Sequence, residues 1–296
     1  MQINALPWRD PSGSQSVGAT ASLQATIAYA LSAPGSGFRK ELCLTVGRAM
    51  ELEPQVAVKL ADGVENFHDA SLLLDDLPCM DDAMERRGRL TTHIVHGESR
   101  AILAALALIN RAYVSCWSAA SQRPTTAGRA ARLVNRLMGE AGILDGQDRD
   151  LHFCLEMGAG EVLAIAALKT GSLLQLCLML PAVVADAGFR ELLYLGRLAR
   201  YWGKAYQALD DFKDLQLAET SAGKTPFQDH DKNRPNLVHS MGASQALWVI
   251  VSLLEDASRQ VDRLASLNPR WRFLEGFHRK FADQRDWLLF NLHPTS

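Results

Sequence analysis

The chain has 296 residues, of which 48% are hydrophobic and 22% are charged, a normal balance for a globular protein with a sizeable core. Its formal net charge of −2 excludes a general nucleic-acid binder, because such proteins are usually basic. Five widely spaced cysteines without a CxxC pair argue against a zinc site and against a disulfide framework, so we expect a cytoplasmic protein.

The N-terminal segment MQINALPWRDPSGSQSVGATAS has neither the basic start nor the apolar stretch of a signal peptide. We expect residues 1–18 to form a flexible leader and residues 19–296 to form one domain. No apolar stretch approaches the roughly 18 residues that a membrane span requires, so we expect no span.

Helix-forming residues dominate the rest of the chain, and alternating β-branched stretches are nearly absent. Apolar residues recur at the i, i+3, i+4 spacing of amphipathic helices in residues 55–76, 99–120, 129–147, 192–215 and 243–267. Residues 168–188 are apolar almost all round, which predicts a central helix. The pattern predicts one all-α domain of roughly ten helices.

Two Asp-rich segments follow apolar helical stretches and lie about 135 residues apart. They contain Asp75, Asp76, Asp81 and Asp82, and then Asp210, Asp211 and Asp214. The C-terminal end of a helix carries partial negative charge, so carboxylates there cost stability unless a cation compensates. Oxygen ligands suit Mg²⁺, which usually binds substrate phosphates as well. One such cluster is more often a solvated helix end, but two favour a shared Mg²⁺–diphosphate site.

A diphosphate also needs fixed positive groups, and several candidates lie beside these clusters. They are Arg39, Arg86, Arg87 and Lys224, with Lys169 and Thr170 at the expected start of a buried helix. Each cation alone is more often an ordinary surface residue. His68 lies seven residues before Asp75 and so shares its helix face, although it also fits a hydrogen-bonded core histidine.

The segment FHDASLLLDDLPCMDDAMERRG resembles the first Asp-rich motif of trans-isoprenyl diphosphate synthases, and is most similar to that of the geranylgeranyl diphosphate synthases. YQALDDFKD resembles their second motif, and LKTGSLL, GILDGQDRDL and AGKTPF resemble further segments in order. The resemblance covers roughly residues 20–240. It implies an all-α bundle around a deep central cavity, usually a homodimer, that condenses isopentenyl diphosphate with an allylic diphosphate.

The resemblance also implies roles for individual residues, with about three Mg²⁺ ions in each site. It assigns Mg²⁺ binding to Asp75, Asp76, Asp81 or Asp82, Asp210, Asp211 and Asp214. It assigns the allylic diphosphate to Arg86, Lys169 and Lys224, with Thr170 and Gln207 nearby, and isopentenyl diphosphate to Arg39, His68 and Arg87. Asp75, Asp76, Asp210, Asp211 and Lys169 form the implied catalytic set, and Gln147 and Asp150 match a further segment.

Product length in the family depends on the residues before the first motif. Ala70 and Ser71 are small and leave room for a chain longer than fifteen carbons, which favours geranylgeranyl diphosphate. Phe67 is either the floor of this space or an ordinary core residue.

One departure from the family pattern falls in the segment PGSGFRKEL. Ser36 stands where the family has a lysine that contacts isopentenyl diphosphate, while Arg39 is kept and Lys40 is out of register. Losing such a contact costs about 1.5–3 kcal/mol.

Two further hypotheses stay open, and this departure motivates the first. One is a terpene cyclase or a prenyltransferase with an altered acceptor, and the other is a non-catalytic subunit of a synthase. The retained DDFKD argues against a cyclase, and the complete set of aspartates argues against a silent subunit.

Overall fold

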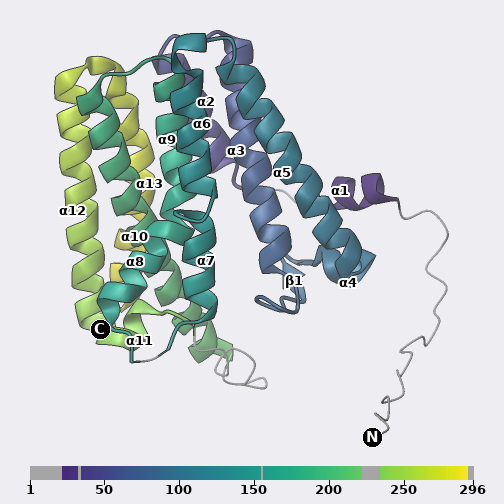
Figure 1. The fold of residues 1–296 in the computed structure, drawn as a ribbon. Coiled ribbons are helices and arrows are strands. Elements are labelled where there is room, and N and C mark those ends of the chain that lie inside the picture. Colours follow the sequence, from purple (N-terminus) through teal and green to yellow (C-terminus); the bar gives the residue numbers. More distant parts are fainter. Residues whose placement is uncertain (1–21, 33–34, 155, 222–233, 293–296) are drawn as a thin grey trace, which may run out of the picture.

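The structure is a computed structural model that describes residues 22–32, 35–154, 156–221 and 234–292, without the side chains of 214–221 and 290–292. The expected leader, residues 1–18, and the candidate ligand Lys224 therefore lie outside the described residues. The described residues form thirteen α-helices, one 3-10 helix and one two-stranded hairpin, which confirms the all-α prediction (Figure 1).

In chain order the elements are α1 (Leu23–Leu31), α2 (Phe38–Ala49), α3 (Pro54–Asp75), β1 (Glu85–Arg86), β2 (Arg89–Leu90), α4 (Thr92–His96), α5 (Glu98–Ala120), α6 (Pro124–Met138), α7 (Ile143–Leu151), α8 (Ala159–Lys169), α9 (Gly171–Val184), α10 (Phe189–Ser221), α11 (Leu237–Met241), α12 (Ala243–Leu267), η1 (Pro269–Phe273) and α13 (Leu274–Leu292).

Helix α9 is the centre of the bundle, as its all-round apolar sequence predicts. All but one of its fourteen residues are buried, and α2, α6 and α10 pack around it. Helices α3 and α5 pack along each other and form the side of the molecule nearest α1 and α4 (Figure 1). The first Asp-rich segment lies at the C-terminal end of α3, whereas the second lies inside α10, which continues to Ser221 and so does not end at its aspartates as the sequence suggested.

Two close approaches of the backbone bring α7 and α10 against the junction of α8 and α9. A Cβ atom on Gly203 of α10 would lie 2.5 Å from the Cα atom of Gly171, and one on Gly146 of α7 would meet the backbone of Lys169. At this junction α8 and α9 are bent by 42°. The sequence placed Lys169 at the start of the buried helix, but Lys169 ends α8 and Thr170 precedes α9.

The hairpin was not foreseen from the sequence. Arg86 pairs with Arg89, and the two residues between them, Arg87 and Gly88, have φ angles of 55° and 73°. Two consecutive positive φ angles are typical of the tight turn that matches the twist of a hairpin. The hairpin fixes where the arginines after the first Asp cluster lie.

Helix α5 is long and apolar enough to cross a membrane by length and composition alone, so the expectation of no membrane span stays a prediction. The bent pair of helices α8 and α9 also has the length and composition of a membrane span if the two helices are counted as one. The core helices of soluble proteins can have the same length and composition. One face of α5 packs on α3, as a core helix does. Its opposite face exposes Leu103, Leu106, Val114 and Trp117.

Candidate active site

The first Asp cluster lies on the C-terminal end of α3 and on the loop that folds back under it. Asp75 is the last helical residue and Asp76 is the C-cap. The backbone N–H of Asp81 donates to the carbonyl of Asp75 at 2.8 Å, and that of Ala83 donates to the carbonyl of Asp76 at 3.2 Å. The loop thereby satisfies carbonyl groups that a helix end leaves without partners. Asp82 is exposed and has a φ angle of 49°.

The carboxylates of this cluster are incompletely neutralised. Burial raises the pKa of Asp75 to about 6; Lys169 lowers this pKa and Asp81 raises it. Asp76 is 4% exposed, and burial raises its pKa although its Oδ1 accepts a hydrogen bond from Nε of Arg86 at 2.7 Å. A bound cation would lower the free energy of such partly desolvated carboxylates, because it stabilises their charged form.

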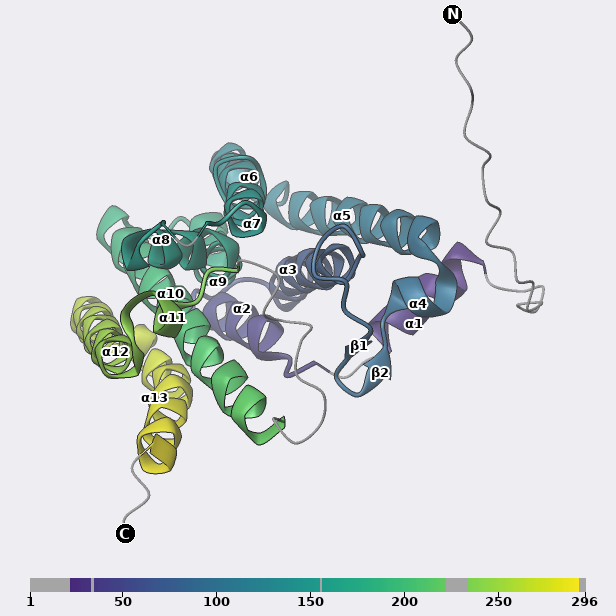
Figure 2. The same cartoon turned by 90° about the horizontal axis from the view of Figure 1, so that it is seen from below.

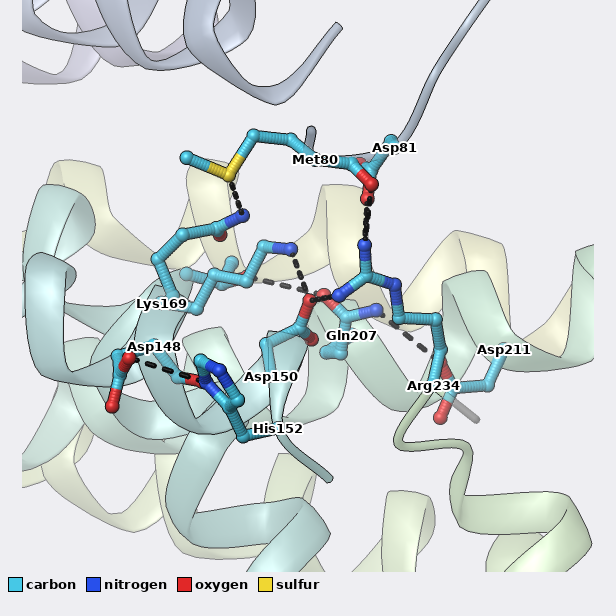
Figure 3. A network of polar contacts seen from close by, with 11 residues as sticks. Met80, Asp81, Asp148, Asp150, His152, Lys169, Gln207, Asp211 and Arg234 are labelled. Atoms are coloured by element: carbon cyan, nitrogen blue, oxygen red, sulfur yellow. Dashed lines mark hydrogen bonds and ion pairs between the residues drawn. The ribbon is translucent and has the colours of Figure 1, made fainter. Parts of the chain in front are cut away.

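A network of ion pairs connects this cluster to α7 and to the α8–α9 junction (Figure 3). Arg234 donates to Oδ1 of Asp81 at 2.8 Å, to the carbonyl of Met80 at 2.9 Å and to Oδ2 of Asp150 at 3.4 Å. The same Oδ2 of Asp150 accepts a hydrogen bond from Nζ of Lys169 at 2.8 Å. Asp150 therefore holds two cations beside the first Asp cluster.

The second Asp cluster meets the α8–α9 junction through α10. Gln207 donates to Oδ1 of Asp211 at 3.2 Å and lies 3.2 Å from the hydroxyl of Thr170. Oδ2 of the buried Asp211 accepts from the backbone N–H of Leu237 at 2.7 Å, which anchors the start of α11. Asp210 lies 4.0 Å from Nζ of Lys213, and burial raises its pKa. The side chain of Asp214 lies outside the described residues.

The donor set fits Mg²⁺ without forming a cage. In the part of the chain that the structure describes, no three acidic, His or Cys side chains converge on a point that would hold a metal ion. Mg²⁺ keeps several waters and takes one or two carboxylates together with substrate phosphates, so it needs no complete protein cage. Burial raises the pKa of Asp75, Asp76 and Asp210, and a bound cation would offset that cost.

Arg39 and His68, both expected near isopentenyl diphosphate, contact each other. Nη1 of Arg39 lies 3.3 Å from Nε2 of His68. Burial, followed by the charges of Arg39 and Arg87, lowers the pKa of His68 to about 3. His68 is therefore neutral near pH 7 and accepts a hydrogen bond from the guanidinium of Arg39. Arg87 lies over the backbone of Gly35, where an added Cβ would come 3.1 Å from its Nη1.

A cavity of about 280 Å³ opens beside Arg39. It lies between α2, α9, α10 and α13, and it is lined by Ser36, Phe38, Arg39, Leu174, Tyr206, Lys280, Phe281 and Gln284. Seen from below, α2 lies between α3 and the C-terminal helix α13 (Figure 2). No pattern in the sequence predicted that α13 would line the candidate site.

The residues expected to set product length line neither this cavity nor a smaller one near Arg86. Ala70 packs with Leu73, Ala104 and Leu108 between α3 and α5. The hydroxyl of Ser71 donates to the carbonyl of His68 at 2.8 Å. Phe67 is buried and packs edge-to-face on Tyr113 of α5, with 5.0 Å between ring centroids.

Sequence reasoning missed Arg234. The residue stands in a segment rich in helix breakers, two positions before Asn236, which caps α11 through its side chain. An N-cap motif was the available signal that this segment is ordered. Nothing local pairs Arg234 with Asp81, which lies 153 residues away in the sequence.

Comparisons with known proteins place most of the chain in one family. The family model described as polyprenyl synthetase matches residues 20–266. A farnesyl diphosphate synthase of Geobacillus stearothermophilus is 33% identical over 82% of this chain and 84% of its own length. A geranylgeranyl diphosphate synthase of Pantoea ananas is 36% identical over 71% of this chain and 69% of its own length.

Solved structures share the fold. A geranyltransferase from Legionella pneumophila superposes with a TM-score of 0.76 at 20% identity and covers 91% of this chain and 90% of its own. An isoprenoid synthase family member from Thermotoga neapolitana gives 0.69 at 26% identity, with 90% of each chain covered. From the family match and these relatives, we conclude that the chain belongs to the polyprenyl synthetase family of trans-isoprenyl diphosphate synthases.

Proposed function

We propose that the protein condenses isopentenyl diphosphate with an allylic diphosphate in a Mg²⁺-dependent reaction and releases geranylgeranyl diphosphate. The observation that carries the proposal is the network that joins Asp81, Arg234, Asp150 and Lys169 between two Asp-rich segments. Relatives named as farnesyl and as geranylgeranyl diphosphate synthases support the reaction class. The longer product rests on the sequence resemblance, because Ala70 and Ser71 are small but line neither of the two cavities.

In the proposed reaction, the residues of this chain bind and orient two diphosphates. Asp75, Asp76 and Asp210 would hold Mg²⁺, which would neutralise the allylic diphosphate as it leaves. Lys169 and Arg234, both paired with Asp150, would donate hydrogen bonds to that diphosphate. Arg39, oriented by the neutral ring of His68, would hold isopentenyl diphosphate. The apolar side chains of Phe38, Leu174 and Phe281 would limit water near the reacting carbon atoms.

The proposal also covers the assembly and the cellular location of the protein. The exposed apolar face of α5 supports a homodimer in which this face packs against a second copy. Arg111 is exposed near the middle of α5, and a charge at that depth is costly in lipid, which favours a protein partner over a membrane. All five cysteines have free thiols, which suits a cytoplasmic location.

The test is a product assay with purified protein, Mg²⁺, labelled isopentenyl diphosphate, and dimethylallyl, geranyl or farnesyl diphosphate in turn. Chromatography and mass spectrometry should identify a twenty-carbon diphosphate. Asp75→Asn should lower kcat by roughly a hundredfold or more, because it removes a metal ligand. Asp186→Asn is the matched control, since Asp186 belongs to an exposed ion pair with Arg129.

The other outcomes are distinct. A fifteen-carbon diphosphate alone would contradict the product length but keep the reaction. An allylic substrate converted to a hydrocarbon or an alcohol would indicate a cyclase. Consumption of neither substrate would indicate a non-catalytic subunit.

A further inference from the structure

The cavity beside Arg39 combines two segments from opposite ends of the chain. Phe38 and Arg39 begin α2, Ser36 lies just before it, and Lys280, Phe281 and Gln284 come from α13. Arg39 and Lys280 are the cations among the described residues that line it, and no described acidic residue lines it. The cavity therefore presents two positive charges to any molecule that enters.

Arg39 has an unmet hydrogen bond at this position. Its Nη1 contacts His68, but its Nε is buried and has no hydrogen-bond partner within the described residues. A buried N–H group without an acceptor carries a desolvation cost, but this nitrogen has almost no surface open to the cavity. The attraction of the cavity for an anion therefore rests on the positive charges of Arg39 and Lys280.

Neither Ser36, which departs from the family pattern, nor its neighbour Lys40 supplies the missing positive charge. The hydroxyl of Ser36 accepts a hydrogen bond from the backbone N–H of Phe38 at 3.3 Å and carries no charge. Lys40 forms an ion pair with Asp62 of α3 at 2.7 Å and is not among the residues that line the cavity. A second cation for a diphosphate must come from another part of the chain.

Lys280 is held in a suitable place by an aromatic cluster. The ring of Phe38 packs edge-to-face against Phe277 and Phe281 of α13, with centroid separations of 5.5 and 5.7 Å. Nζ of Lys280 lies 5.0 Å from the ring centroid of Phe277 and 5.6 Å from that of Phe38. Since Phe38 directly precedes Arg39, these contacts fix α13 and its lysine beside the start of α2.

The present partner of Lys280 is a weak competitor. Nζ lies 3.0 Å from Oε2 of Glu41, and the two side chains are 50% and 58% exposed. An ion pair this exposed contributes little to stability. The ammonium group of a lysine acts as a point charge and is attracted most strongly by the partner with the most negative charge. Because a diphosphate carries more charge than one carboxylate, it would displace Glu41 from Lys280.

We propose that Lys280 of the C-terminal helix is a diphosphate ligand of the isopentenyl diphosphate subsite and replaces the lysine that is absent at Ser36. This inference rests on the proposed function, because it names a residue for a substrate that the proposal already assigns to Arg39. The C-terminal helix then forms one wall of the active site, and its docking on α2 contributes to substrate binding.

The experiment measures binding of isopentenyl diphosphate by isothermal titration calorimetry, with Mg²⁺ and without an allylic substrate, so that no turnover occurs. Lys280→Ala should raise Kd about tenfold, since a charge-assisted hydrogen bond is lost at a half-exposed position. Lys280→Arg should retain most of the affinity. Adding Ser36→Lys to Lys280→Ala should restore binding. In steady-state assays, the KM for isopentenyl diphosphate should rise while that for the allylic diphosphate stays unchanged.

Two control variants separate a ligand from a structural role. Arg279→Ala removes the neighbouring exposed cation, which does not line the cavity, and should leave Kd unchanged. Glu41→Gln breaks the same ion pair from its other side, so it should leave Kd unchanged or lower it. An unchanged Kd in Lys280→Ala, or an equal rise in Glu41→Gln, would overturn the inference.

Failure of the proposed function is recognised separately. If the wild-type protein neither binds isopentenyl diphosphate nor elongates an allylic substrate, the proposed function falls and the role of Lys280 falls with it. If the wild-type protein elongates and Lys280→Ala keeps the wild-type Kd, the role of Lys280 alone is refuted.

Discussion

Asp150 organises the positive charge of the candidate site through a single carboxylate. It is 9% exposed, and its Oδ2 accepts hydrogen bonds from both Lys169 and Arg234. Two cations this close repel each other, and a shared carboxylate offsets that repulsion before any substrate arrives. A diphosphate then meets donors that are already oriented, which lowers the entropic cost of binding. Removing Asp150 would thus affect two ligands at once.

His68 provides a pH prediction, because its pKa is lowered to about 3 from an ordinary value of 6.5. The unfolded chain binds a proton at this residue below pH 6.5, and the folded chain does not until the pH approaches 3. The free energy of unfolding therefore falls as the pH falls through this window. Between pH 7 and pH 5 this histidine should remove about 2 kcal/mol, and His68→Gln should abolish that loss.

The measurement is urea unfolding of both proteins at pH 7, 6 and 5. The pKa values of Asp69 and Asp75 are raised to about 6, so these residues change stability with pH in the opposite direction. They remain in both proteins, and the difference between the two curves isolates His68. A difference that stays constant from pH 7 to pH 5 would mean that His68 is protonated as easily as in the unfolded chain.

At the scale of elements, the site depends on how closely α10 crosses the α8–α9 junction. Thr170 lies at that junction and reaches Asp211 through Gln207. Gly203, four residues before Gln207 on α10, lies against Gly171 at the start of α9. The second Asp cluster is therefore positioned by a contact between two glycines one helical turn away.

Gly203→Ala tests this dependence. The added Cβ would lie 2.5 Å from the Cα atom of Gly171 and 2.8 Å from its nitrogen, and neither backbone atom can turn aside. We expect a loss of about 2–3 kcal/mol in the free energy of unfolding, with lower activity as α10 shifts. Gly160→Ala on α8 is the matched control: nothing lies within 4 Å of its Cβ, so it should gain about 0.5 kcal/mol. Equal stability of the two variants in urea unfolding would contradict the close approach.

At the scale of the whole molecule, the sequence predicted what is local. The 3.6-residue period of apolar side chains marks α3, α5 and α10, and the first Asp-rich segment marks the end of α3. The second Asp-rich segment does not mark the end of α10, which continues to Ser221. The hairpin was not predicted, because its strands are only two residues long and depend on the Arg87–Gly88 turn. Two contacts between distant segments were not predicted either, because such contacts leave no periodic signal in the sequence. They are the pairing of Arg234 with Asp81 and the position of Lys280 beside Arg39.

The exposed face of α5 gives the last prediction, which concerns assembly. Leu103, Leu106, Val114 and Trp117 recur at helical spacing and are 50–68% exposed, while the opposite face packs on α3. An apolar stripe of this kind is costly in water and favours association with a like stripe on a second copy.

We expect the wild-type protein to be a dimer in analytical ultracentrifugation and Val114→Asp to be a folded monomer. Trp248→Asp is the matched control, because Trp248 is 71% exposed on α12, away from this stripe, so this variant should remain a dimer. If the wild-type protein is a monomer that floats with lipid vesicles, the stripe of α5 binds a membrane instead. If it is a monomer that does not bind vesicles, the stripe binds a different protein.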